Sequence, residues 1–65
     1  MNSDPVVGDS VECWLFNTPD AAHYGERWIG EVLKVDYNQR RPYLVTRPGY
    51  PNIEVKIKEI WKIVS

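Results

Sequence analysis

Residues 53–64 read Ile53-Glu54-Val55-Lys56-Ile57-Lys58-Glu59-Ile60-Trp61-Lys62-Ile63-Val64. The first five residues alternate between apolar and charged side chains, which is the period of a β-strand with one buried face. The alternation breaks over residues 57–60 and is followed by a short apolar end. This spacing predicts a strand, a single 3₁₀ turn and a short closing strand. An amphipathic helix is the competing interpretation, but isoleucine and valine supply most of the apolar positions, which favours strand.

Three more strands are predicted upstream, over residues 10–16, 27–37 and 42–47, because apolar and polar side chains alternate in each. The phase slips in the second of them, since Val35 is also needed inside. A bulge or strong bend near residues 33–34 explains the slip, and Gly30 permits the close approach of another backbone. Turn-forming residues predict a loop, a hairpin tip and a turn, over 17–26, 38–41 and 48–52 respectively.

Four to five short antiparallel strands, with a one-turn helix before the last, predict a small all-β SH3-like barrel. Closure of the barrel explains how so short a sheet avoids exposed edges. We expect residues 1–9 to form a flexible lead-in that ends in a turn, and residues 10–65 to form a single barrel domain. A chain of 65 residues leaves no room for a second core.

Cysteine and histidine are too scarce to build a metal site. Cys13 and His23 are the only ones, whereas a structural zinc site of the Cys/His kind needs four ligands. We expect Cys13 to be a small core residue and His23 an ordinary loop residue. No phosphate-binding loop or pair of catalytic carboxylates is present, so neither a cofactor nor catalysis is expected. The lone thiol indicates a reducing, intracellular compartment, and no apolar run suggests a signal peptide or a membrane partner.

The charge is divided unevenly along a chain whose net charge is only −1. Residues 1–39 hold two basic and seven acidic side chains, whereas residues 40–65 hold six basic and two acidic ones. Either the two halves neutralise each other across the barrel, or the basic residues form a strip that meets an acidic or phosphate-bearing partner.

Several short segments carry a resemblance to a known family: Gly8-Asp9-Ser10-Val11, Trp28-Ile29-Gly30-Glu31-Val32 with Val35-Asp36, Tyr43-Leu44-Val45 and Ile57-Lys58-Glu59-Ile60. Over roughly residues 8–64 the chain resembles Tudor and Agenet domains, which are SH3-like barrels of the chromatin-reader group. The resemblance implies a nuclear protein; without it, a cytoplasmic one is expected.

That resemblance also implies a ligand, because these domains hold methylated lysine or arginine by cation–π attraction in a cage of aromatic rings. The aromatic residues that match the cage, or that extend its walls, are Trp14, Phe16, Tyr24, Trp28 and Tyr50. An acidic residue, Asp20 or Glu26, would complete it. Arg47 stands where the family has an aromatic residue on the third strand.

The large aromatic residues divide into two groups by expected role. Trp61 and Tyr43 are expected to pack in the barrel, because a small core needs their large apolar area. Trp14 and Trp28 either pack as well or line a binding groove with the loop tyrosines. Our first hypothesis is therefore a non-catalytic module that binds a peptide or a methylated side chain, in which Trp28→Ala abolishes binding and leaves the fold intact.

Two other functions remain open. A nucleic-acid-binding barrel would use the basic set Arg40, Arg41, Arg47, Lys56 and Lys58, with Lys56 and Lys58 on one face of the fourth strand. The sequence pI of about 5.7 argues against it, because nucleic-acid-binding domains are usually basic. The third possibility is a small accessory subunit or an oligomer that buries its aromatic side chains against another chain.

Overall fold

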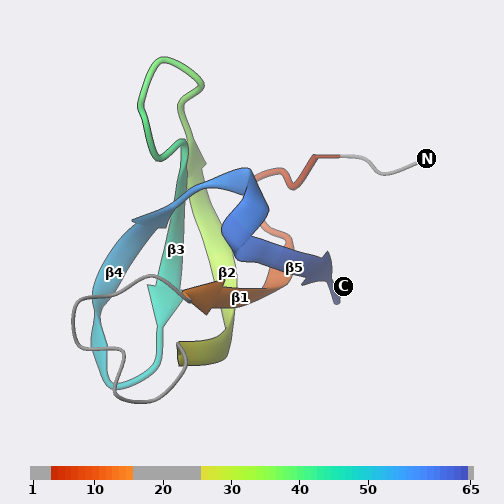
Figure 1. Ribbon diagram of the computed structural model, residues 1–65, viewed down its shortest axis with the longest axis vertical. Helices are drawn as coiled ribbons and strands as arrows, with labels where there is room; N and C mark the ends of the chain where they lie inside the picture. Colours follow the sequence, from red (N-terminus) through yellow and green to blue (C-terminus); the bar gives the residue numbers. More distant parts are fainter. Residues whose placement is uncertain (1–3, 16–25, 65) are drawn as a thin grey trace.

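The computed structural model describes residues 4–15 and 26–64 of the chain. They form five antiparallel strands and one 3₁₀ turn: β1 (Ser10–Leu15), β2 (Glu26–Val35), β3 (Tyr43–Arg47), β4 (Tyr50–Val55), η1 (Ile57–Glu59) and β5 (Ile60–Ile63) (Figure 1). The strands hydrogen-bond in the order β4-β3-β2-β1-β5. This is the all-β, SH3-like arrangement expected from the sequence, including the 3₁₀ turn before the last strand. Within the described residues, no helix has the length and apolar character needed to cross a membrane.

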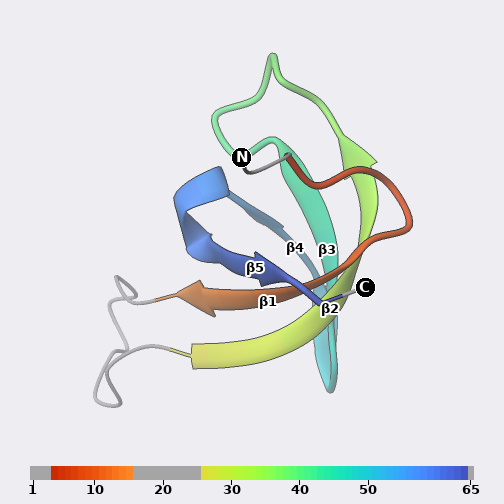
Figure 2. The same cartoon turned by 90° about the vertical axis from the view of Figure 1, so that its right-hand side faces the viewer.

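The long strand β2 joins the two halves of the sheet. Its first half pairs with β1, from Glu26 opposite Leu15 onwards, and its last residues pair with β3. Figure 2 shows β2 curving between these two partners. The register shifts between Val32 and Lys34, so that Leu33 is an extra residue on this strand. The bulge expected near residues 33–34 is confirmed.

Gly30 lies where β2 passes very close to β3. A Cβ atom at this position would overlap the carbonyl oxygen of Thr46. The same oxygen accepts a 2.8 Å hydrogen bond from Trp28 Nε1, and the Thr46 hydroxyl accepts another, also 2.8 Å, from the Glu31 backbone N–H. The close backbone approach expected at Gly30 is therefore present, and it is stabilised by two hydrogen bonds to one threonine.

The core lies inside the curved sheet. Its members are apolar side chains from four of the strands: Val11, Cys13, Leu15, Trp28, Val32, Tyr43, Val45 and Val55. The inward direction expected for Cys13 is confirmed, as is the packing of Tyr43. Trp28 belongs to this core and is only 9% exposed, so it does not stand on an open surface.

The turn between β3 and β4 is shorter than predicted. Only Pro48 and Gly49 form it, and Gly49 has a φ of 81°, which glycine adopts without strain. β4 then begins at Tyr50, so the turn predicted through residue 52 is wrong. Pro51 is accommodated within β4 because this strand is at the edge of the sheet, where an absent N–H breaks no ladder.

The strand order leaves β4 and β5 as the two edges of the sheet, so the closure without exposed edges expected from the sequence is not present among the described strands. Two further segments flank the sheet. The turn at residues 6–9 is held to β2 by two backbone hydrogen bonds of 2.9 Å each, one from Gly8 N to Val32 O and one from Val32 N to Asp9 O. At the other end, Lys56 follows β4 and Lys58 lies in η1. The prediction that these two lysines share one face of the fourth strand is wrong, because the strand ends at Val55.

Candidate binding groove between β1, β5 and the 3₁₀ turn

Two tryptophans lie together on the side of the β5-β1-β2 sheet that faces away from the core, which we call the outer face. Trp14 alternates with the buried Cys13 and Leu15, so its side chain points outwards. Its ring centroid lies 5.5 Å from that of Trp61 on β5, and the two ring planes meet at 68°. Such edge-to-face packing suits the quadrupoles of two indoles.

A bulge in β5 explains why Trp61 points outwards. Val11 and Cys13 on β1 are buried, and their partners on β5 are Ile63 and Ile60. The register shifts between Glu12 and Cys13, which leaves Trp61 as an extra residue on β5. A bulge of this kind redirects a side chain. Trp61 is 61% exposed as a result, and the expectation that it packs in the core is wrong.

A hollow of about 440 Å³ opens beside the pair, lined by Trp14, Lys58, Glu59 and Trp61. We call it the tryptophan groove. The two indoles come from β1 and β5, while the lysine and the glutamate come from η1. The break in alternation that the sequence shows over residues 57–60 therefore builds one wall of the groove.

Arg27 lies against both indoles. It is the direct partner of Trp14 in the β1–β2 register, and its guanidinium carbon is 4.6 Å from the centre of the Trp14 ring and 5.9 Å from that of Trp61. Its Nε is 3.7 Å from Glu12 Oε2. A cation at these distances is attracted by the negative faces of the rings. The chain itself therefore supplies a cation to the tryptophan pair.

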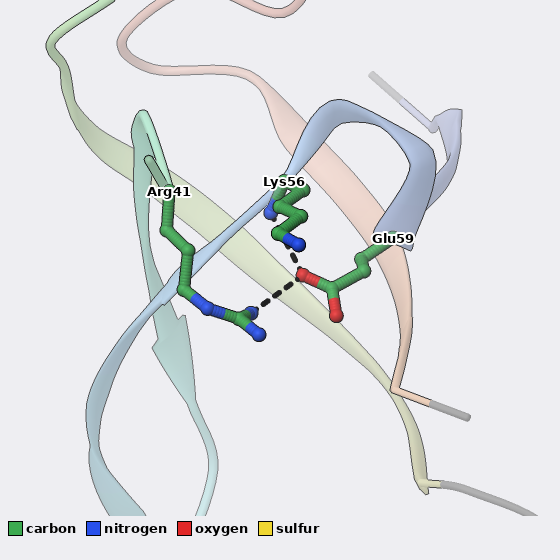
Figure 3. Close-up of polar contacts among 3 residues, drawn as sticks. All are labelled: Arg41, Lys56 and Glu59. Atoms are coloured by element: carbon green, nitrogen blue, oxygen red, sulfur yellow. Dashed lines mark hydrogen bonds and ion pairs between the residues drawn. The ribbon is translucent and has the colours of Figure 1, made fainter. Parts of the chain in front are cut away.

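The wall formed by η1 is fixed by a buried carboxylate. Glu59 is 8% exposed, and its Oε1 accepts hydrogen bonds of 2.8 Å from Arg41 Nη1 and from the backbone N–H of Lys56 (Figure 3). The Glu59 backbone N–H donates in turn to Lys56 O, at 2.9 Å. These contacts close the 3₁₀ turn on itself and attach it to the segment that leads into β3.

A second aromatic cluster contains the residues expected for the other cage walls. The Arg47 guanidinium carbon lies 4.3 Å from the centre of the Tyr50 ring and 5.5 Å from that of Trp28. The Arg47 guanidinium therefore lies against two rings, those of Tyr50 and Trp28, that the Tudor-like resemblance assigned to a ligand.

Of the predicted cage residues that the structure describes, Trp28 and Tyr50 lie against the same arginine, Arg47, and Trp14 lies apart from them. Trp14 and Trp28 are on paired strands, but one points outwards and the other lies in the core, and Tyr50 contacts Arg47. Glu26 is the first residue of β2. Phe16, Asp20 and Tyr24, like His23, lie outside the described residues. Sequence reasoning missed Arg27 and Trp61 as site residues, because the positions of both side chains beside Trp14 depend on how the strands pair.

The predicted basic strip is also divided. Arg41 is bonded to Glu59, and Arg47 lies against two rings at the other end of β3. Lys56 is half-buried, Arg40 is exposed near the hairpin tip, and Lys58 lines the tryptophan groove. Arg41 and Lys56 therefore meet at Glu59, with Lys58 beside it in η1, whereas Arg47 lies apart against Tyr50 and Trp28.

Two buried groups have perturbed acidity. Burial raises the pKa of the Cys13 thiol from 9.0 to about 11, and the negative charge of Glu59 adds to this. Burial also raises the pKa of Tyr43, helped by a hydrogen bond with Tyr37. Both shifts move the ionisation of these groups further into the alkaline range. In residues 4–15 and 26–64, no three His, Cys, Asp or Glu side chains gather in a way that could hold a metal ion.

The chain matches no protein-family model, no curated protein and no solved structure. The geometry of the tryptophan groove is therefore the basis for assigning a function.

Proposed function

We propose that this domain is a protein-interaction module that binds a peptide by taking one apolar side chain into the tryptophan groove. The observation that carries the proposal is the position of Trp61, an indole that is 61% exposed beside a hollow of about 440 Å³. Large exposed aromatic surfaces usually mark binding sites, and tryptophan is enriched among the residues that dominate binding energy. The volume is in the range of small-ligand pockets, so it suits an inserted side chain.

The groove is also prepared for binding before a ligand arrives. Its η1 wall is held by the Glu59 carboxylate, and its tryptophan wall is held by edge-to-face packing of Trp14 on Trp61. A ligand that enters a fixed site loses less free energy to ordering of the protein. These features support recognition of a short peptide segment.

An unmodified peptide is better supported than a methylated lysine. A methylammonium needs an aromatic face, and Arg27 already lies 4.6 Å from the centre of the Trp14 ring, as Arg47 lies 5.5 Å from that of Trp28. A methylated ligand would have to displace a guanidinium in either place. The nucleic-acid alternative has less support, because Arg41 and Arg47 are already engaged within the chain.

The test is a two-dimensional NMR titration of the labelled domain that follows the three indole N–H signals. The ligands are a leucine-centred peptide, the same peptide with trimethyl-lysine in place of leucine, and a short oligo-dT. We expect the leucine peptide to shift the signals of Trp14 and Trp61. The signal of Trp28 serves as an internal control, because its N–H is bonded to Thr46 O.

Trp61→Ala should abolish these shifts and keep a dispersed spectrum. Tyr37→Ala is the matched control, since Tyr37 is 65% exposed and lies at the β2–β3 hairpin, outside the groove. Shifts produced only by the trimethyl-lysine peptide, or only by the oligonucleotide, would replace the proposal with the corresponding alternative. No shift with any peptide would refute it.

A further inference from the structure

We infer that the partner of the tryptophan groove is an acidic peptide, and that Arg27 determines this preference. The inference rests on the proposed function and names the chemistry of its ligand. Two cations lie at the indoles, Arg27 on β2 against both rings and Lys58 on η1 at the groove. Lys62 follows Trp61 on β5 and is the strand partner of Glu12.

Anions that could balance these cations are few among the described residues. Glu59 lines the groove, but its charge is already matched by Arg41 at 2.8 Å. Glu12 is 3.7 Å from Arg27 and is also the strand partner of Lys62, so one carboxylate faces two cations. No described carboxylate lies within ion-pair distance of Lys58. Counted over the described side chains, the rim of the groove therefore carries net positive charge.

Arg27 excludes cationic ligands in two ways. Its guanidinium lies on the ring faces that would attract a ligand cation, and its charge repels a lysine or arginine brought close to them. A ligand carboxylate is attracted by the same charges. It can approach Arg27 and Lys58 while a neighbouring apolar side chain of the ligand enters the groove. Opposed charges at a rim affect which partner binds more than they affect the total affinity.

A peptide with a few carboxylates fits this face better than a continuous polyanion. Glu12 and Glu31 alternate with the cations on the same outer face, with Glu31 opposite Ser10 at the far end of β1. A phosphate backbone that crossed the face would have to pass both carboxylates. One or two acidic residues beside an apolar anchor can contact Arg27 and Lys58 without doing so.

The experiment measures the affinity of three nine-residue peptides by isothermal titration calorimetry. Each has a central leucine, flanked on both sides by aspartate, serine or lysine. We expect the aspartate peptide to bind most tightly and the lysine peptide most weakly. Arg27→Gln should lower the affinity for the aspartate peptide by roughly two- to fivefold, which corresponds to the loss of one exposed ion pair. The same variant should raise the affinity for the lysine peptide, since it removes the repulsion and uncovers the Trp14 ring.

Lys34→Gln is the matched control, because it removes the same charge from an exposed position of β2 that lies outside the groove. It should leave the ranking and the affinities unchanged. Equal binding of all three peptides, unaltered by Arg27→Gln, would overturn the inference and leave the proposed function standing. Failure of every peptide to bind would refute the proposed function as well. Oligo-dT that displaces the aspartate peptide, and binds less well to Arg27→Gln, would assign the face to nucleic acid instead.

Discussion

The Arg41 guanidinium donates a 2.8 Å hydrogen bond to Glu59 Oε1, across 18 residues of sequence. The pair joins the segment before β3 to the 3₁₀ turn that forms one wall of the tryptophan groove. Arg41 was a candidate for contacting nucleic acid, and the structure gives it this internal partner. Arg41 therefore holds the η1 wall of the tryptophan groove in place through its bond to Glu59.

We expect Glu59→Gln to lower the free energy of unfolding by roughly 1–3 kcal/mol, because it removes a buried charged acceptor from Arg41 and from the Lys56 N–H. Arg41→Ala should cost less, about 1 kcal/mol or below, since its side chain is 43% exposed and water can replace it. Urea denaturation followed by tryptophan fluorescence measures both. An unchanged midpoint in Glu59→Gln would contradict the role given to the carboxylate.

Trp28 and Trp61 should respond in opposite ways to truncation. Trp28 is 9% exposed and its indole N–H is bonded, so we expect Trp28→Ala to cost about 3–5 kcal/mol, enough to unfold a domain of this size. Trp61→Ala removes a ring that is 61% exposed and should cost about 1 kcal/mol or less. Thermal unfolding monitored by circular dichroism separates the two variants. A folded Trp28→Ala that only loses binding would restore the groove expected from the sequence.

The sequence predicted the strands and the bulge near Leu33 because both depend on local alternation of side chains. It misplaced Trp61, because the direction of that side chain depends on a bulge opposite Glu12 and Cys13, and pairing partners are not visible in local periodicity. The contact of Arg27 with Trp14 has the same origin, since only the β1–β2 register makes them neighbours. The site was therefore harder to predict than the fold that carries it.

Two glycines offer a test of the β2–β3 packing. We expect Gly30→Ala to destabilise the domain by roughly 1–3 kcal/mol or more, because its Cβ would overlap the Thr46 carbonyl and disturb the Trp28 hydrogen bond. The Cβ of Gly49→Ala would lie in open space, so this variant should lose only about 1–2 kcal/mol of unfolding free energy, from the strain of its positive φ. Hydrogen exchange of the Trp28 indole N–H distinguishes them: it should accelerate far more in Gly30→Ala. Equal protection of this N–H in both variants would contradict the prediction, because it would mean that β3 can move away from the new Cβ without weakening the Trp28–Thr46 hydrogen bond.

The ionisation of Cys13 should make the stability of the domain depend on pH in the alkaline range. Burial, and then the charge of Glu59, raise the pKa of this thiol from 9.0 to about 11. The unfolded chain therefore loses the proton first, and the stability that comes from keeping the thiol neutral is complete below pH 9. It falls as the pH rises from 9 to about 11, by up to about 1.4 kcal/mol for each pH unit.

The matched variant is Cys13→Ala, which lacks the ionisable group and keeps the lysines and Tyr43, so that their titration contributes to both proteins. The free energies of unfolding, measured in urea at pH 7, 9 and 10.5 with a reductant present, should differ most at pH 7. The difference should narrow at pH 10.5, because only the wild type loses the contribution of the thiol. Two profiles that stay parallel over this range would mean that Cys13 ionises equally in the folded and unfolded chains, which its position in the core does not allow.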